Sequence, residues 1–182
     1  MRLSKPRVNP KEKSDMTAEE LEFMAPFEEP WFNIFKTLIH HPSLMRRWLV
    51  FANHILGKST LPAREREIVI LRIGYLCKAG YEWGQHVLIG RRCGLSDDEI
   101  RRIKAGPSAA GWNDLDRLLL QSTDELRGDA HISDATWQGL TRHLDKQQLM
   151  DLVFTVGQYN LVSMALNSFG VQLDPGLPGF DL

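Results

Sequence analysis

Apolar residues recur at helical spacing along nearly the whole chain, and this periodicity is the feature that most limits the possible fold. One such helical face carries Met45, Trp48, Leu49, Ala52 and Leu56. It follows Pro42, a residue that suits the first position of a helix. A second stripe follows Asn113, and a third runs from Leu149 to about Phe169. Since no run alternates apolar and polar residues between hairpin turns, we expect an all-α fold of about seven or eight helices.

Capping residues mark several helix boundaries. Ser96 and Glu99 form a predicted capping box, in which the two side chains satisfy free backbone amides at the start of a helix. Further candidate caps are Asn113, Ser133 and Asp145 at helix starts and Gly94 and Gly170 at helix ends.

Charge and length exclude several classes of protein. The 182 residues suit one domain, and 22 basic against 23 acidic residues give a net charge of −1, which argues against a nucleic-acid partner. This balance permits self-association. The apolar run Ile68–Leu71 is far shorter than the ~20 residues of a membrane span, and no signal peptide is visible, so no membrane partner is expected. Two cysteines provide no disulfide framework, which favours a cytoplasmic location.

The composition divides the chain into three parts. Residues 1–20 are polar, begin with basic residues and are predicted to form a mobile N-terminal arm. Residues 21–173 carry the helical pattern and form the predicted domain. Residues 174–182 are rich in proline and glycine and are expected to lie extended, on the surface or on a neighbouring subunit.

Residues 62–86 hold most of the chemically unusual side chains. Glu82 and His86 are four residues apart, so on a helix they share one face, where the carboxylate can fix the imidazole tautomer and raise its basicity. Such a pair can work as a general acid and base. A solvated ion pair is the alternative, but Tyr81 and Trp83 flank Glu82, and this aromatic setting favours a pocket wall.

Glu67 is the next candidate, because it directly precedes the strongly apolar Ile68–Leu71. On one straight helix it would lie ~22 Å from Glu82. The two carboxylates can meet only if the helix breaks between them, and Lys78-Ala79-Gly80 is the natural place for that break.

Three blocks, Leu61–Ile68, Tyr81–His86 and Gly94–Ile100, resemble the carboxymuconolactone decarboxylase family, which also contains the AhpD-like alkylhydroperoxidases. The similarity extends over roughly residues 35–175. It implies an AhpD-like helical bundle that assembles as homo-oligomers, from dimers to hexamers.

The chain departs from the hydroperoxidase branch of this family. AhpD-like members carry a Cys-x-x-Cys pair ahead of the histidine, and those cysteines would fall at Ala79 and Glu82. Peroxide reduction by that pair needs one thiolate to attack and a second thiol to resolve, and Glu82 can do neither.

The decarboxylase-like branch therefore fits better. It implies a lyase or isomerase that works without a cofactor on a small carboxylated or oxygenated ring compound. No metal is expected either, because Glu82 and His86 supply only half of a metal site and no second paired motif accompanies them. By this resemblance His86, Glu82 and Glu67 are catalytic and transfer protons. The candidate substrate-binding residues are Tyr81, Trp83, Arg64 and Gln158. For the arginine, Arg66 and Arg72 are equal alternatives, and arginine suits a carboxylate through its two-pronged geometry.

Other interpretations remain open at this point. Cys77 or Cys93 could support a hydroperoxidase, although they lie 16 residues apart and Cys77 adjoins an apolar face. The chain could also be a non-catalytic ligand-binding oligomer. Gln158, Tyr159 and Asn167 are polar positions in an apolar helix, where they could lie in a helix interface or in a pocket.

Overall fold

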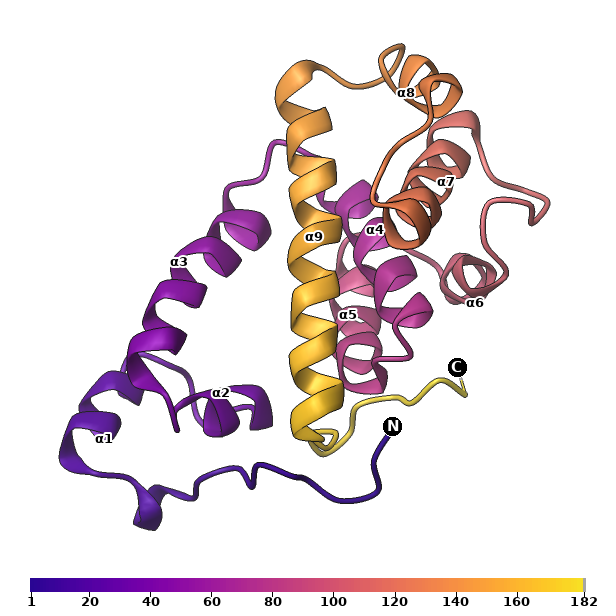
Figure 1. The fold of residues 1–182 in the computed structure, drawn as a ribbon. Coiled ribbons are helices and arrows are strands. Elements are labelled where there is room, and N and C mark those ends of the chain that lie inside the picture. The colour runs from indigo at the N-terminus through magenta and orange to yellow at the C-terminus, as the bar shows by residue number, and fades with distance from the viewer. Residues whose placement is uncertain (182) are drawn as a thin grey trace.

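The computed structural model describes residues 1–181 and confirms an all-α fold, with no strand in this part of the chain (Figure 1). A 3-10 helix, η1 (Lys13–Asp15), precedes nine α-helices within these residues. They are α1 (Ala18–Met24), α2 (Asn33–Leu38), α3 (Pro42–Gly57), α4 (Ala63–Leu76), α5 (Gly80–Arg92), α6 (Asp97–Ala105), α7 (Asp114–Asp129), α8 (Asp134–Leu140) and α9 (Lys146–Phe169). The count exceeds the expected seven or eight, and α1 and α2 are short elements of only seven and six residues.

Helix α4 is the centre of the molecule and contacts α5, α6, α7 and α9. Every residue from Arg66 to Gly74 is buried, because neighbouring helices cover α4 on most of its sides. The apolar run Ile68–Leu71 is therefore the middle of the core and shows no exposed face. This arrangement makes Glu67 and Arg72 buried charges that need partners inside the fold.

The chain reverses between α4 and α5 where the sequence predicted a break. Lys78 adopts a φ of 53°, a left-handed conformation that is unusual for a residue with a side chain. Helix α4 ends at Leu76 and α5 starts at Gly80, so the two helices pack against each other as a hairpin. A Cβ atom at Gly74 would lie 3.3 Å from the Cγ atom of Glu82, which shows how closely the helices approach.

The capping predictions are confirmed. Ser96 and Glu99 form the capping box of α6, and Asn113, Ser133 and Asp145 accept backbone hydrogen bonds at the starts of α7, α8 and α9. Gly94 and Gly170 have φ values of 95° and 71°, in the region that glycine adopts without strain.

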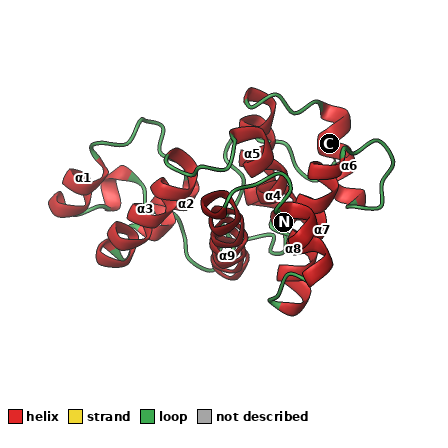
Figure 2. Cartoon of the chain, turned by 90° about the horizontal axis from the view of Figure 1, so that it is seen from above, coloured by secondary structure: helices red, strands yellow, loops and turns green. Residues whose placement is uncertain are grey.

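Helices α1, α2 and α3 stand apart from the main bundle, with α9 between the two groups (Figure 2). They have a separate small core of Met16, Met24, Ile39 and Met45. Helix α9 is long and apolar enough to cross a membrane by length and composition, but half of the relevant segment is buried inside the fold. Its inner face packs on α4, and its other side looks toward α3.

Both terminal segments lie on the helical domain. The predicted arm is held by backbone hydrogen bonds from Arg7 and Val8 to the Phe169 carbonyl and from Lys11 to the Lys36 carbonyl. In the predicted tail, the Asp174 carboxylate accepts a hydrogen bond of 2.8 Å from the Asn33 backbone amide at the start of α2. The last predicted tail residue, 182, lies outside the described residues.

Candidate functional site

The hairpin of α4 and α5 brings the three predicted catalytic residues together. The Nδ1 atom of His86 lies 2.6 Å from Glu67 Oε2, and its Nε2 atom lies 2.9 Å from Glu82 Oε1. Glu67 comes from α4 and the other two residues from α5, one helical turn apart. One imidazole is thus held between two carboxylates, with both ring nitrogens engaged.

This cluster is nearly dry. The exposed fractions are 0% for Glu67 and 4% for both Glu82 and His86. On the far side from the histidine, the Arg66 guanidinium contacts the second oxygen of Glu67 at 3.3 Å. Glu67 is therefore saturated by two cations inside the fold, which is the arrangement that a fully buried carboxylate needs.

The histidine is charged at neutral pH in this setting. Burial opposes the charged imidazolium, but the two carboxylates and their hydrogen bonds outweigh it and raise the pKa of His86 to about 10. An imidazolium between two carboxylates holds a proton that either carboxylate can share.

A pocket of about 170 Å³ reaches this cluster from the side of α3 and α9. Glu82 and His86 line it, whereas Glu67 does not. Most of the remaining wall is apolar and includes Ile34, Trp48 and Val162. The two carboxylates on His86 therefore differ in access, and Glu82 is the one that a small molecule can reach.

Two polar side chains on α9 line the same pocket without a partner. Gln158 and Tyr159 are 4% and 5% exposed, and neither side chain forms a hydrogen bond within the described chain. The Tyr159 ring packs edge-on against the His86 ring, with 4.9 Å between centroids. Burial, together with the charges of Glu82 and Glu67, raises the pKa of Tyr159, so its hydroxyl stays protonated as a hydrogen-bond donor. Buried polar groups without partners are uncommon, and here they face an opening.

Tyr81 also lines the pocket, but its hydroxyl is already engaged. It donates to Asp174, and the same carboxylate accepts a hydrogen bond of 2.9 Å from Gln85 Nε2. Because Asp174 also binds the start of α2, these contacts tie the chain end, α5 and α2 together beside the pocket. Tyr81 contributes a wall and a brace there.

Two of the predicted substrate-binding residues point elsewhere. Trp83 does not line this pocket, because its ring packs between Tyr75 and Phe180 on the opposite side of α5. The guanidinium of Arg64 is bound by both oxygens of Asp116, at 2.9 and 2.8 Å, and by Glu99. We correct the prediction for both residues, since neither is placed to touch a ligand beside His86.

The alternative arginines are engaged as well. Arg66 binds Glu67, and Arg72 forms a paired contact with Asp124 at 2.6 and 2.7 Å. Sequence reasoning singled out Gln158 but left Tyr159 between a packing and a pocket role. The signal for both was their polarity within the apolar α9.

The cysteines lie away from the pocket. Cys77 is buried and its thiol donates to the Asn160 side chain at 3.2 Å, while burial and the charge of Glu67 raise the pKa of Cys93. A raised pKa disfavours the thiolate that peroxide chemistry requires. Among residues 1–181, no group of three or more His, Cys, Asp or Glu side chains is arranged to hold a metal ion.

A sequence model of one family covers the part of the chain that builds this cluster. The model described as the carboxymuconolactone decarboxylase family matches residues 42–119, which include Glu67, Glu82 and His86. The match places Glu67, Glu82 and His86 within the segment that is similar to this family. No curated protein matches the chain by sequence.

Solved structures share the family fold across nearly the whole chain. A protein from Silicibacter sp. TM1040, described as an uncharacterized peroxidase-related protein, is 14% identical, covers 96% of this chain and 97% of its own, and has a TM-score of 0.80. The AhpD core protein from Ralstonia eutropha JMP134 is 17% identical over 93% of each chain, with a TM-score of 0.79.

The debrominase Bmp8 has the same fold. A cysteine-to-alanine variant in complex with 2,3,4-tribromopyrrole is 13% identical over 94% of each chain, with a TM-score of 0.75. At these identities the likeness establishes the AhpD-like fold of the present chain and nothing finer.

Proposed function

We propose that this chain is a cofactor-independent enzyme that moves protons on a small oxygenated ring compound, as a lyase or isomerase of the carboxymuconolactone decarboxylase type. The observation that carries the proposal is the Glu67–His86–Glu82 cluster, with contacts of 2.6 and 2.9 Å and one end open to a pocket. The match to the family model and the fold shared with the debrominase support an enzymatic role.

Glu82 is the group that meets the substrate in this scheme. Its carboxylate lines the pocket and accepts a proton from a carbon next to a carbonyl group, which leaves an enolate on the substrate. The Glu82–His86 pair, whose acidic protons exchange with solvent, then delivers a proton to a different carbon, so that the double bond moves. Glu67 does not reach the pocket and acts as a positioning residue that keeps the imidazole charged and oriented.

The enolate oxygen also needs stabilisation. The Tyr159 hydroxyl and the Gln158 amide are unpartnered groups in the pocket wall that can donate hydrogen bonds. Donors that are already fixed in a dry site stabilise developing charge more effectively than water does.

The test is deuterium exchange. Small unsaturated lactones and cyclic ketones are incubated with the protein in D₂O, and incorporation at carbon is followed by NMR. We expect exchange with the natural chain and a loss of about 10²–10⁴-fold in His86→Ala and Glu82→Gln. His131→Ala, which alters an exposed histidine, is the control and should retain the rate. A fully active, folded His86→Ala protein would rule out the mechanism.

No specific observation favours a hydroperoxidase. Neither Cys77 nor Cys93 lines the pocket at His86, and the pKa of Cys93 is raised. Free-thiol titration should therefore be unchanged after peroxide treatment.

We also propose that the chain acts as a homo-oligomer in the cytoplasm. Helix α9 exposes four large apolar side chains, Met150, Phe154, Leu161 and Met164. Together with Gly157 they are spaced alternately four and three residues apart along the helix. This is the spacing of a helix seam that packs on another helix, and the small Gly157 would allow close approach. On α3, Leu44 and Phe51 continue the apolar surface, and Phe51 contacts Phe154.

A second copy of the chain is the occupant that we assign to this surface. Sedimentation should show an assembly of at least two copies. Phe154→Glu should shift it toward the monomer, whereas Gln138→Glu, at an exposed position on α8, should not.

A further inference from the structure

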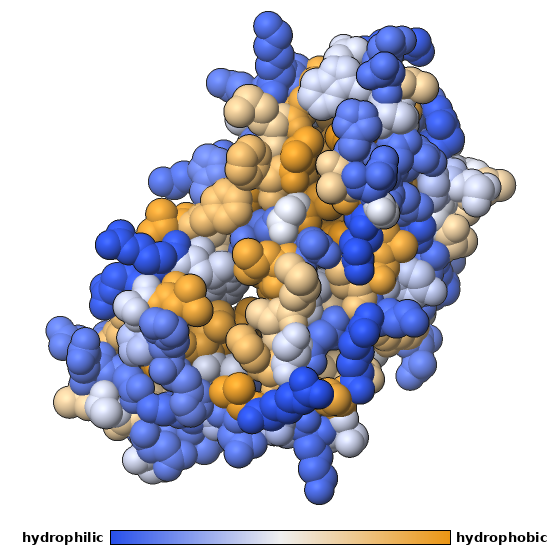
Figure 3. All heavy atoms as spheres, in the orientation of Figure 1, coloured by the Kyte–Doolittle hydropathy of each residue, from blue (hydrophilic) through white to orange (hydrophobic). Residues whose placement is uncertain are grey.

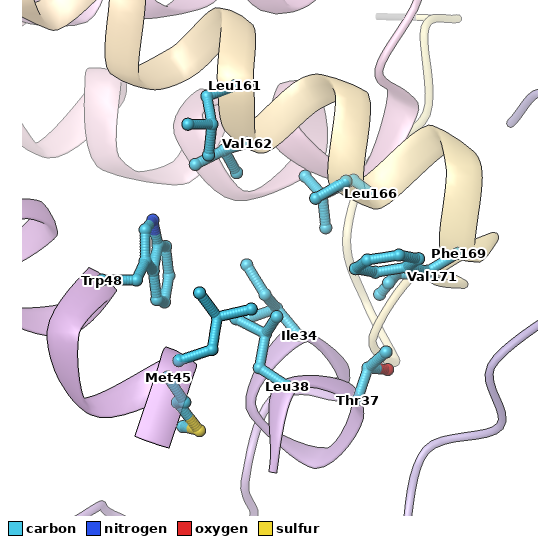
Figure 4. A pocket seen from close by; sticks show the side chains of 12 residues that line it. Ile34, Thr37, Leu38, Met45, Trp48, Leu161, Val162, Leu166, Phe169 and Val171 are labelled. Carbon is cyan, nitrogen blue, oxygen red and sulfur yellow. The ribbon is translucent and has the colours of Figure 1, made fainter. Parts of the chain in front are cut away.

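A second cavity adjoins the catalytic pocket. It is partly open to the surface and has a volume of about 120 Å³ between α2, α3 and α9. Side chains from both sides converge on it, among them Leu38 and Met45 on one side and Leu166 and Phe169 on the other (Figure 4). Its wall is carbon, apart from the Thr37 hydroxyl, which is buried and has no hydrogen-bond partner. We call this cavity the apolar chamber.

The chamber adjoins the catalytic pocket. Ile34, Trp48 and Val162 line both spaces, so these three side chains form the boundary between them. The space-filling view shows hydrophobic side chains gathered along the hollow between α3 and α9 (Figure 3). The two spaces thus lie side by side, separated only by side chains of this shared wall.

The volumes of the pocket and the chamber each suit one small part of a ligand. A dry cavity of ~150 Å³ accepts a benzene ring. By that standard the pocket of about 170 Å³ takes one ring, and the chamber of about 120 Å³ takes a short alkyl group.

The charges around the two spaces exclude an anionic ligand. Among the described residues, no lysine or arginine lines either space. The positive charge of His86 is already matched by Glu67 and Glu82, and Glu82 itself faces the ligand. A carboxylate placed here would lose its hydration and meet a second carboxylate, and both effects oppose binding. The unpartnered Gln158 and Tyr159 instead offer hydrogen bonds to a neutral hydroxyl or carbonyl oxygen.

We propose that the substrate is an uncharged amphipathic molecule, with an oxygenated ring against Glu82 and His86 and an apolar substituent in the chamber. This inference rests on the proposed function and narrows it. An uncharged substrate has no carboxylate to lose as carbon dioxide. The reaction is then an isomerisation, in which Glu82 removes a proton from one carbon and the Glu82–His86 pair delivers a proton to another.

Calorimetric titration at pH 7.5 with three probes tests the proposal without requiring turnover. The probes are phenol, 4-butylphenol and 4-butylbenzoate, which separate the effect of the alkyl group from the effect of charge. We expect the Kd of 4-butylphenol to be at least about tenfold lower than that of phenol, because the butyl group buries several methylenes. We expect it to be at least about tenfold lower than that of 4-butylbenzoate as well, because only the latter is ionised.

Two matched variants locate the alkyl group. Ala165 lines the chamber and does not line the catalytic pocket, so Ala165→Phe should remove the advantage of 4-butylphenol and leave phenol unchanged. Gln138→Phe adds the same ring at an exposed position on α8, which lines neither space, and should change neither Kd.

Several outcomes would overturn the inference. They are equal or tighter binding of 4-butylbenzoate, no measurable binding of 4-butylphenol, or an alkyl advantage that survives in Ala165→Phe. These results are independent of the exchange assay. Selective binding without any deuterium exchange would defeat the proposed function alone, and exchange with preferred binding of the carboxylate would defeat this inference alone.

Discussion

The two sides of His86 hold the same kind of group for different purposes. On the inner side, Glu67 is fully buried and is saturated by His86 and Arg66. On the outer side, Glu82 lines a pocket whose wall also contains the unpartnered Gln158 and Tyr159. On the inner side every charged group has a partner, and these contacts fix the imidazole. On the outer side polar groups lack hydrogen-bond partners, which a ligand in the pocket can supply. Chemical identity alone therefore does not assign a role to a carboxylate, and access to the pocket decides it.

The largest effect on stability is expected when the inner carboxylate, Glu67, is neutralised. Glu67→Gln leaves two buried cations, His86 and Arg66, without their shared partner. Breaking a buried ion pair costs about 3–5 kcal/mol of the free energy of unfolding. Urea denaturation should show this loss, whereas Glu65→Gln, a partly exposed neighbour, should stay within about 0.5 kcal/mol. A Glu67→Gln protein as stable as the natural chain would contradict the structural role of the inner side.

The pH dependence of stability should report the whole cluster. The pKa of His86 is raised from 6.5 to about 10, so the folded state binds this proton more tightly than the unfolded state does. The contribution is fully present below about pH 6.5 and is lost as the pH rises toward 10. Urea denaturation between pH 7 and pH 9 should show stability falling with pH. The same curve in His86→Gln should be flatter, and an identical slope would contradict the raised pKa.

Neutralising the outer carboxylate should cost less stability than neutralising the inner one. Glu82→Gln removes one charged hydrogen bond of 2.9 Å to His86, and such bonds contribute about 1.5–3 kcal/mol. The glutamine amide can face the pocket, where water can reach it. Urea denaturation of Glu82→Gln and Glu67→Gln side by side gives the difference. Equal losses would mean that the two sides of His86 are equivalent.

The smallest effect is expected at the edge of the pocket. Tyr159→Phe removes a hydroxyl that has no hydrogen-bond partner in the described chain, so the free energy of unfolding should change by less than about 0.5 kcal/mol. Deuterium exchange should nevertheless slow, because the proposed enolate loses a donor. A large loss of stability in this variant would show that the hydroxyl supports the fold and is not reserved for a ligand.

The local architecture of the site was predictable from the sequence. The apolar run after Glu67, the break at residues 78–80 and the four-residue step from Glu82 to His86 together allow the two carboxylates to meet at the histidine. Each of these signals is local, because it depends on spacing within one helix or one turn. The cap residues were predictable for the same reason.

The pocket itself was not predictable, since it forms between elements far apart in the sequence. Its walls come from α2, α3, α5 and α9, and helical periodicity does not reveal which helices face each other. The error at Trp83 has a local cause. Tyr81, Glu82, Gln85 and His86 share the face of α5 that meets the pocket, and the step of about 100° per residue carries Trp83 past the edge of that face. Glu82 turns to His86, and Trp83 turns to Tyr75 and Phe180.

Trp48, at the boundary of the pocket and the chamber, should make ligand binding visible by fluorescence. Trp48 lines the catalytic pocket, the apolar chamber and the outer groove beside Phe51 and Phe154. Indole emission responds to the polarity of its surroundings, so a molecule that enters any of these spaces alters the light that Trp48 emits. The other four tryptophans line none of the three, and the chain thereby carries its own intrinsic probe of occupancy.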